Sequence, residues 1–147
     1  MINIKPLKAY TDNYIWLLET NEEVSIVDPG DAKPVLDYLS KTNKNIRDIF
    51  ITHHHFDHTA GVPELENIIS GSIYGPKNSY ELINEKVTQG DTLSSLGIKF
   101  EIIEVPGHTL DHIAFYNEEN DILFCGDTLF AGGCGRVFEG TFDQMFE

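Results

Sequence analysis

The chain has 147 residues, and its apolar share of 41% with a mean hydropathy of −0.21 is typical of one globular domain. The formal net charge of −14 repels phosphate backbones and argues against a nucleic-acid partner, no stretch approaches transmembrane length, and the N-terminus lacks the apolar core of a signal peptide. Two cysteines are too few for a disulfide scaffold, so we expect a monomeric cytoplasmic protein with reduced thiols and no contact with membranes.

The first half of the chain is predicted to alternate between strands and helices. Apolar runs bounded by turn residues predict strands over residues 2–9, 13–19, 24–27 and 46–51. Apolar residues at helical spacing predict a helix over residues 32–40, for which Asp31 is a suitable N-cap. A short helix is expected over residues 63–69, because Pro63 is well tolerated in a first helical turn.

The second half is rich in short strands. Apolar runs predict strands over residues 98–105, 113–116 and 122–125. Strands and helices followed by antiparallel strand pairs predict a layered α/β fold in which helices cover a sheet. Polar residues that follow such strands are expected to meet at one edge of the sheet.

Four potential metal ligands fall within six residues, directly after a predicted buried strand. They are His53, His55, Asp57 and His58, in the run Thr-His-His-His-Phe-Asp-His. Side chains two apart in an extended chain point to the same side, so His53 and His55 can hold one ion together, whereas His54 faces away. A turn at Asp57 and His58 would direct them to a second ion, since paired catalytic metals lie about 3.5–4 Å apart. Neutral imidazole and carboxylate ligands suit Zn, Fe and Mn.

Three further candidates follow other predicted strands. His108 stands in Pro-Gly-His-Thr and is a natural third imidazole. Asp127 stands in Gly-Asp-Thr and could bridge two ions with its two oxygens. Asp28 could orient a ligand histidine through a hydrogen bond. We expect His54 and His112 to be structural, because their neighbours already supply the ligands.

The order of these motifs resembles the metallo-β-lactamase superfamily. The histidine-rich run, then Gly-His-Thr, then Gly-Asp-Thr carry this resemblance. Three further segments resemble the glyoxalase II branch, the hydroxyacylglutathione hydrolases, and the likeness covers nearly the whole chain. These segments are Thr-Asp-Asn-Tyr at residues 11–14, Val-Asp-Pro-Gly at residues 27–30, and Leu-Phe-Ala-Gly-Gly-Cys-Gly-Arg-Val-Phe-Glu-Gly-Thr at residues 129–141.

The resemblance implies an αββα sandwich over residues 1–147 with a centre for two metal ions. Zn²⁺ is the expected metal, and Fe or Mn would suit the same ligands. The implied ligands divide into three for the first ion, two for the second ion and one that bridges both, which are His53, His55 and His108, then Asp57 and His58, then Asp127.

The same resemblance implies hydrolysis of a small-molecule glutathione thioester, S-D-lactoylglutathione, to D-lactate and glutathione. The metal activates a water that attacks the thioester carbonyl, and the thiolate is a good leaving group. Asp57 and His58 are the implied catalytic residues, with Asp57 holding the attacking hydroxide in line. Arg136 and Phe138 would contact the glutathione part, Arg136 through a carboxylate; many relatives carry Lys and Tyr there.

The chain departs from the family pattern in its C-terminal part. The family supplies another histidine to the second ion from beyond the bridging Asp, and no histidine follows His112 here. The family's C-terminal helical region, which contacts glutathione, also has no counterpart. We therefore expect a catalytic domain that lacks its C-terminal part, holds one ion well and the second poorly, and leaves apolar surface or sheet edges uncovered.

Two other functions stay open. An iron-dependent persulfide dioxygenase would need a facial triad of histidines and a carboxylate around one ion. The missing histidine of the second site favours this alternative more than a complete two-ion site would. The Gly-Cys-Gly-Arg segment favours the hydrolase. A catalytically inactive metal-binding fragment of the hydrolase is the alternative outside the enzymes.

Overall fold

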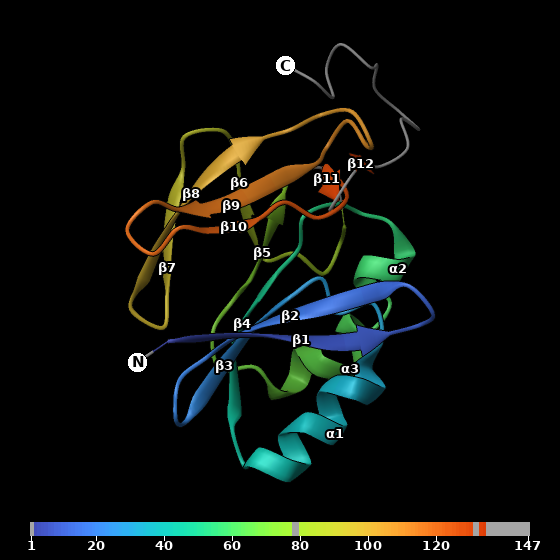
Figure 1. Cartoon of the computed structure of the whole chain (residues 1–147), viewed down its shortest axis with the longest axis vertical. Coiled ribbons are helices and arrows are strands. Elements are labelled where there is room, and N and C mark those ends of the chain that lie inside the picture. Colours follow the sequence, from blue (N-terminus) through green and yellow to red (C-terminus); the bar gives the residue numbers. More distant parts are fainter. Residues whose placement is uncertain (1, 78–79, 131–132, 135–147) are drawn as a thin grey trace.

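The computed structural model describes residues 2–77, 80–130 and 133–134, which form stacked layers (Figure 1). Helices cover one face of a six-stranded sheet, and a four-stranded sheet packs on its other face. The mixed α/β sandwich predicted from the sequence is therefore confirmed. Every helix within the described ranges precedes residue 73, so the second helical layer of the predicted sandwich is not among them.

The six-stranded sheet has the strand order β1-β2-β3-β4-β5-β6. Its strands are β1 (Asn3–Ala9), β2 (Asn13–Glu19), β3 (Glu23–Val27), β4 (Asn45–Phe50), β5 (Ile73–Pro76) and β6 (Glu85–Val87). The pairs β1-β2 and β2-β3 are antiparallel, whereas β3 to β6 run parallel. The loops after β3 and β4 therefore leave the sheet at the same edge.

The helices between these strands are mostly short. Helix α1 (Ala32–Thr42) has Asp31 as its N-cap, as predicted, and Oδ1 of Asp31 accepts from the backbone N–H of Lys33 at 3.1 Å. It ends at Asn43, which adopts the left-handed conformation with φ 56°. Helices α2 (Phe56–Thr59) and α3 (Val62–Leu65) follow β4, and a 3₁₀ turn (Glu66–Ile68) continues α3. None of the described helices is long and apolar enough to cross a membrane.

The four-stranded sheet is an antiparallel meander with the order β10-β9-β8-β7. Its strands are β7 (Thr92–Ser95), β8 (Ile98–Glu104), β9 (Ile113–Asn117) and β10 (Ile122–Phe124). Two very short strands, β11 (Leu129–Phe130) and β12 (Gly133–Cys134), pair with each other beyond it. The end of β8, the start of β9 and the end of β10 lie at one edge, because neighbouring strands are antiparallel.

Strand alternation divides the apolar residues between two cores. Leu17 of β2 and Ile49 of β4 pack towards the helices, whereas their neighbours Leu18 and Phe50 pack between the two sheets. Phe50 is fully buried there and stacks on Phe115 with ring centroids 4.8 Å apart. Successive side chains of a strand point to opposite faces of the sheet, and here both faces are covered. These strands are therefore continuous apolar runs in the sequence.

A buried carboxylate also joins the two sheets. Asp48 of β4 is only 3% exposed, and its Oδ2 accepts from the hydroxyl of Ser95 in β7 at 2.6 Å. Its Oδ1 accepts from the backbone N–H of Ser72 at 2.8 Å, and Ser25 of β3 lies 2.6 Å from the Ser95 oxygen. The buried charge is thus compensated by hydrogen bonds from both sheets.

The strands predicted from long apolar runs are present, and their ends differ by at most one residue. Strands β5, β6 and β7, which have only three or four residues each, were not predicted from the sequence. The helix predicted over residues 63–69 divides into α3 and the 3₁₀ turn. Short elements are difficult to predict from the sequence, because tertiary packing stabilises them more than their local residue pattern does.

We predict that Phe50→Ala lowers the free energy of unfolding of the metal-free chain by about 3–5 kcal/mol, because the cavity would open between both sheets. Urea unfolding followed by circular dichroism measures this loss. Leu36→Ala, at a position 39% exposed on α1, is the control and should cost about 0.5 kcal/mol or less. Equal losses for the two variants would contradict the central place of Phe50.

Candidate metal centre

The histidine-rich loop follows β4 and turns at α2, as its sequence predicted. His53 and His55 lie in the extended part before the helix, two positions apart. Asp57 and His58 lie in the single helical turn of α2, which redirects the chain. Gly30, in the loop after β3, lies against this turn so closely that an added Cβ would be 1.8 Å from the carbonyl oxygen of Asp57. The two loops therefore meet through backbone contact.

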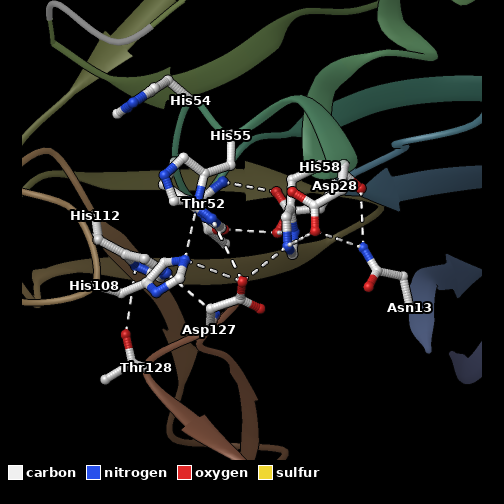
Figure 2. A network of polar contacts seen from close by, with 12 residues as sticks. Asn13, Asp28, Thr52, His54, His55, His58, His108, His112, Asp127 and Thr128 are labelled. Atoms are coloured by element: carbon white, nitrogen blue, oxygen red, sulfur yellow. Dashed lines mark hydrogen bonds and ion pairs between the residues drawn. The ribbon is translucent and has the colours of Figure 1, made fainter. Parts of the chain in front are cut away.

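The first group of potential ligands comes from three separate loops. It consists of His53, His55, His108 and Asp127, whose ligand atoms all lie within 4.8 Å of one another. Nε2 of His108 lies 3.0 Å from Nδ1 of His55, so these two rings present different nitrogens to the centre. Figure 2 shows His55, His108 and Asp127 converging, while His54 points elsewhere.

The second group consists of Asp57, His58 and Asp127, within the same 4.8 Å limit. Asp127 belongs to both groups, and its Oδ2 lies 3.2 Å from Nε2 of His58 and 3.2 Å from Nε2 of His108. The prediction that Asp127 could bridge two ions with its two oxygens stays a prediction. In the structure a single oxygen faces both groups.

Asp28 holds the metal loop through three hydrogen bonds. Its Oδ1 accepts from the backbone N–H of Thr52 at 2.8 Å, and its Oδ2 accepts from the Thr52 hydroxyl at 2.6 Å. The same Oδ2 lies 3.0 Å from Nδ1 of His58, which can donate to it and so leaves Nε2 directed at Asp127. Asp28 adopts φ 51°, an unusual conformation for a residue other than glycine.

Thr52 extends this arrangement to the first group. Its hydroxyl proton is donated to Asp28, so the hydroxyl oxygen is free to accept from Nδ1 of His53, 2.9 Å away. His53 then carries its proton on Nδ1 and presents an unprotonated Nε2. Asp28 therefore orients His58 directly and His53 through Thr52.

Asn13 supports Asp57 from the start of β2. Its amide nitrogen donates to Oδ2 of Asp57 at 3.0 Å and to the carbonyl oxygen of Asp57 at 3.2 Å. Neither this contact nor the role of Thr52 was predicted from the sequence, where Asn13 is only part of the segment at residues 11–14 that resembles glyoxalase II. A polar residue at the end of a predicted strand was the available signal in both cases.

The chemistry of these donors fits a metal ion. Nε2 of His53 is fully buried and has no hydrogen-bond partner within the described residues, although it faces the first group. A buried polar atom without a partner is costly, and a metal ion would remove that cost. Three imidazoles with a carboxylate suit zinc and other transition metals.

Burial and charge divide the histidines by protonation. Burial, reinforced by the neighbouring imidazoles, holds the pKa of His53 far below its usual range. Burial also lowers the pKa of His112, to about 4. For His58 burial acts in the same direction, but the carboxylates of Asp28 and Asp127 outweigh it and raise the pKa to about 10. In the metal-free protein at neutral pH, His53 is therefore neutral and His58 is protonated.

A cavity of about 1360 Å³ adjoins the candidate ligands, and its walls include His55, Asp57 and Asp127. Tyr14 and Trp16 of β2 also line it, with ring centroids 6.0 Å apart. The volume exceeds the usual range of ligand pockets, about 300–1000 Å³, so the cavity can admit a tripeptide-sized molecule.

Some predicted residues lie apart from the cluster. His54 pairs with Asp111, with 3.0 Å between Nδ1 and Oδ1, and belongs to none of the ligand groups. His112 is buried beside the first group without belonging to it. Arg136 and Phe138, the predicted substrate contacts, lie outside the described residues.

Residues 11–146 match the model of a protein family described as the Metallo-beta-lactamase superfamily. Two curated relatives, from Pseudoalteromonas translucida and Chromohalobacter salexigens, are each 50% identical over 99% of this chain and are named hydroxyacylglutathione hydrolase. The chain spans 58% of the length of each of these relatives.

Solved structures show the same fold. The BLEG-1 B3 metallo-beta-lactamase superposes with a TM-score of 0.87 at 21% identity, over 97% of this chain and 81% of that one. ETHE1 from Myxococcus xanthus superposes with a TM-score of 0.81 at 26% identity, over 99% of this chain and 66% of that one. TTHA1623 in a di-iron-bound form gives a TM-score of 0.77 at 24% identity, over 95% of this chain and 80% of that one.

We predict that His58 stays protonated at neutral pH in the metal-free chain and titrates near pH 10. The ordinary value is 6.5, so its charged contacts stabilise the metal-free fold fully below pH 6.5, and this stabilisation is lost as the pH rises through about 10. Asp28→Asn should lower the pKa of His58, because Asp28 raises that pKa more than Asp127 does. Histidine ¹⁵N NMR across this pH range measures both effects.

The control is Asp111→Asn, which removes the carboxylate beside His54 and should leave the titration of His58 unchanged. A wild-type His58 that titrates near 6.5 would contradict the charge arrangement.

Proposed function

The chain belongs to the metallo-beta-lactamase superfamily, and from this premise we propose that it hydrolyses an S-(2-hydroxyacyl)glutathione thioester, with S-D-lactoylglutathione as substrate, at a metal centre. The strongest support is the pair of ligand groups that share Asp127, because hydrolytic centres commonly use two ions with a common ligand. The names of the two relatives at 50% identity support the thioester as substrate.

We assign the first ion to His53, His55 and His108, and the second to Asp57 and His58, with Asp127 shared. Zn²⁺ is the proposed metal, and iron remains a candidate because TTHA1623 is described in a di-iron-bound form. The second group offers three ligand atoms within the described residues, against four in the first. We therefore propose that the first position binds its ion more tightly.

When bound, the metal supplies Lewis acidity, which lowers the pKa of a coordinated water from 15.7 to about 7 and polarises the thioester carbonyl. Asp57 accepts a hydrogen bond from the attacking water and so aligns it, and Asn13 holds that carboxylate in place at 3.0 Å. Asp28 keeps the ring of His58 oriented throughout. The thiolate leaves without a strong general acid, because thiols are acidic.

The cavity beside the ligands accommodates the glutathione part of the substrate. Arg136 is proposed to bind a glutathione carboxylate and Phe138 to pack against the tripeptide. The proposed partner is this small molecule alone, and the chain is proposed to act as a cytoplasmic monomer.

The chain loaded with Zn²⁺ is expected to hydrolyse S-D-lactoylglutathione, followed by release of glutathione thiol. His55→Ala should lower kcat/KM by about 100-fold or more, because it removes a ligand of the first ion. His54→Ala changes the adjacent ring, which belongs to none of the ligand groups, and should retain the wild-type rate.

Equal rates for wild type and His55→Ala would identify the chain as an inactive fragment. Oxygen uptake with glutathione persulfide, in place of thioester hydrolysis, would instead establish the iron-dependent dioxygenase. Both outcomes contradict the proposed hydrolase.

Metal binding at the second group should release about one proton at pH 7–8, because His58 must lose its proton to become a ligand. An ordinary histidine is deprotonated above pH 6.5, whereas His58 keeps its proton up to its pKa of about 10. The affinity for the second ion should therefore rise about tenfold per pH unit between pH 6.5 and 10. Calorimetric titration in two buffers of different ionisation enthalpy measures the proton release. A pH-independent affinity over this range would contradict the assignment of His58 to the second ion.

A further inference from the structure

We propose that His112 is a positioning residue, which fixes the backbone of Asp127 and the ring of His53 in the arrangement that binds metal. The proposed mechanism makes no use of this histidine. It is fully buried directly before β9 and contacts two ligand-bearing segments that are far apart in the chain. The inference rests on the proposed metal centre and deepens it.

The hydrogen bonds of His112 define which nitrogen carries its proton. The backbone N–H of Asp127 points at Nε2 of His112, 3.2 Å away. A backbone N–H can only donate, so Nε2 must be the unprotonated acceptor. Nδ1 then carries the proton and donates to the carbonyl oxygen of Ile113 at 3.1 Å. Nδ1 also lies 3.5 Å from Oγ1 of Thr128, as Figure 2 shows. Both ring nitrogens are therefore engaged, which explains why a sixth histidine so near the cluster is not itself a ligand.

The ring of His112 also supports His53. The two rings are stacked, with centroids 4.5 Å apart and an interplanar angle of 15°. Thr52 holds Nδ1 of His53 from its edge, so the ring is constrained along its edge and on one face. The unpartnered Nε2 is the part left to face His55, His108 and Asp127.

Gly126 shows how closely the chain must pass His112 to reach Asp127. A Cβ added at Gly126 would lie 2.8 Å from both Cε1 and Nε2 of His112 and 2.5 Å from Oγ1 of Thr52. Its φ of +54° is also one that glycine adopts without strain. Gly126 therefore packs directly against Thr52 and His112, the two side chains that support His53.

Loss of the Nε2 acceptor would leave the N–H of Asp127 without its partner beside the ring. The carboxylate of Asp127 would then lose the backbone anchor that keeps its Oδ2 between His58 and His108. Contacts of this kind behind metal ligands typically contribute about 10–100-fold to metal affinity.

The test compares His112→Phe, which keeps a flat ring without an acceptor, with His112→Gln, whose amide oxygen can replace Nε2 as the acceptor. Competition with a chromogenic chelator measures Zn²⁺ affinity, and the absorption of the Co²⁺-loaded chain reports ligand geometry. We expect His112→Phe to bind Zn²⁺ about 10–100-fold more weakly with an altered Co²⁺ spectrum, and His112→Gln to recover most of the affinity. His54→Phe and His54→Gln are the matched controls and should bind as the wild type does.

Each outcome decides between the alternatives. A merely structural histidine would lower the Tm of the metal-free chain while leaving the Zn²⁺ affinity and Co²⁺ spectrum of the folded chain unchanged, and that result would overturn the inference. Equal losses in His112→Phe and His112→Gln would overturn the role of the acceptor nitrogen. A wild-type chain that binds no ion would instead refute the proposed function together with this inference.

The wild-type chain offers a second test, which stands even where His112→Phe does not fold. Long-range ¹H–¹⁵N NMR distinguishes the two neutral forms of an imidazole. We expect His112 to carry its proton on Nδ1 both before and after metal is added. A proton on Nε2 would exclude the hydrogen bond from Asp127 and overturn the inference.

Discussion

The buried carboxylate of Asp28 is the constraint on which the metal centre depends. It is 5% exposed, and its two oxygens accept from the backbone and hydroxyl of Thr52 while one of them also faces Nδ1 of His58. A buried charge is tolerable only where hydrogen bonds compensate for lost hydration, and here the compensating groups are the supports of the ligands themselves. The stability of this loop and the orientation of two imidazoles therefore have the same cause.

The two sheets bring the remaining ligands to this loop. The backbone N–H of Ile113, at the start of β9, donates to the carbonyl oxygen of Thr52 at 2.9 Å, so the edges of the sheets join directly beside the centre. His108 precedes this junction and Asp127 follows β10 at the same edge. Phe50, the last residue of β4, packs between the sheets and stacks on Phe115 of β9, so the two sheets are also in contact close to this edge.

Local pattern was sufficient for the elements and residues whose signal lies within a few positions. The His53–His55 spacing predicted a shared direction, and the need for a turn at Asp57 and His58 was met by α2. The short strands β5 to β7 had no such signal. Asn13 was visible as a polar residue at the start of a predicted strand, but its partner Asp57 lies 44 residues away and could not be identified locally. The orientation of the Asp127 carboxylate, whose Oδ2 faces both ligand groups, also had no local signal, because it depends on neighbours that are far away in the sequence.

The sequence by itself determined which donor types this protein holds, and their spacing along the strand and loop determined which of them could act together. Only the tertiary structure decided which atom of each residue faces the centre. That choice depends on proton positions, and these are set by hydrogen bonds between residues 24 apart for Asp28 and Thr52, 30 apart for Asp28 and His58, and 15 apart for His112 and Asp127. Such contacts exist only after the strands have been brought to one edge, so no local pattern can encode them.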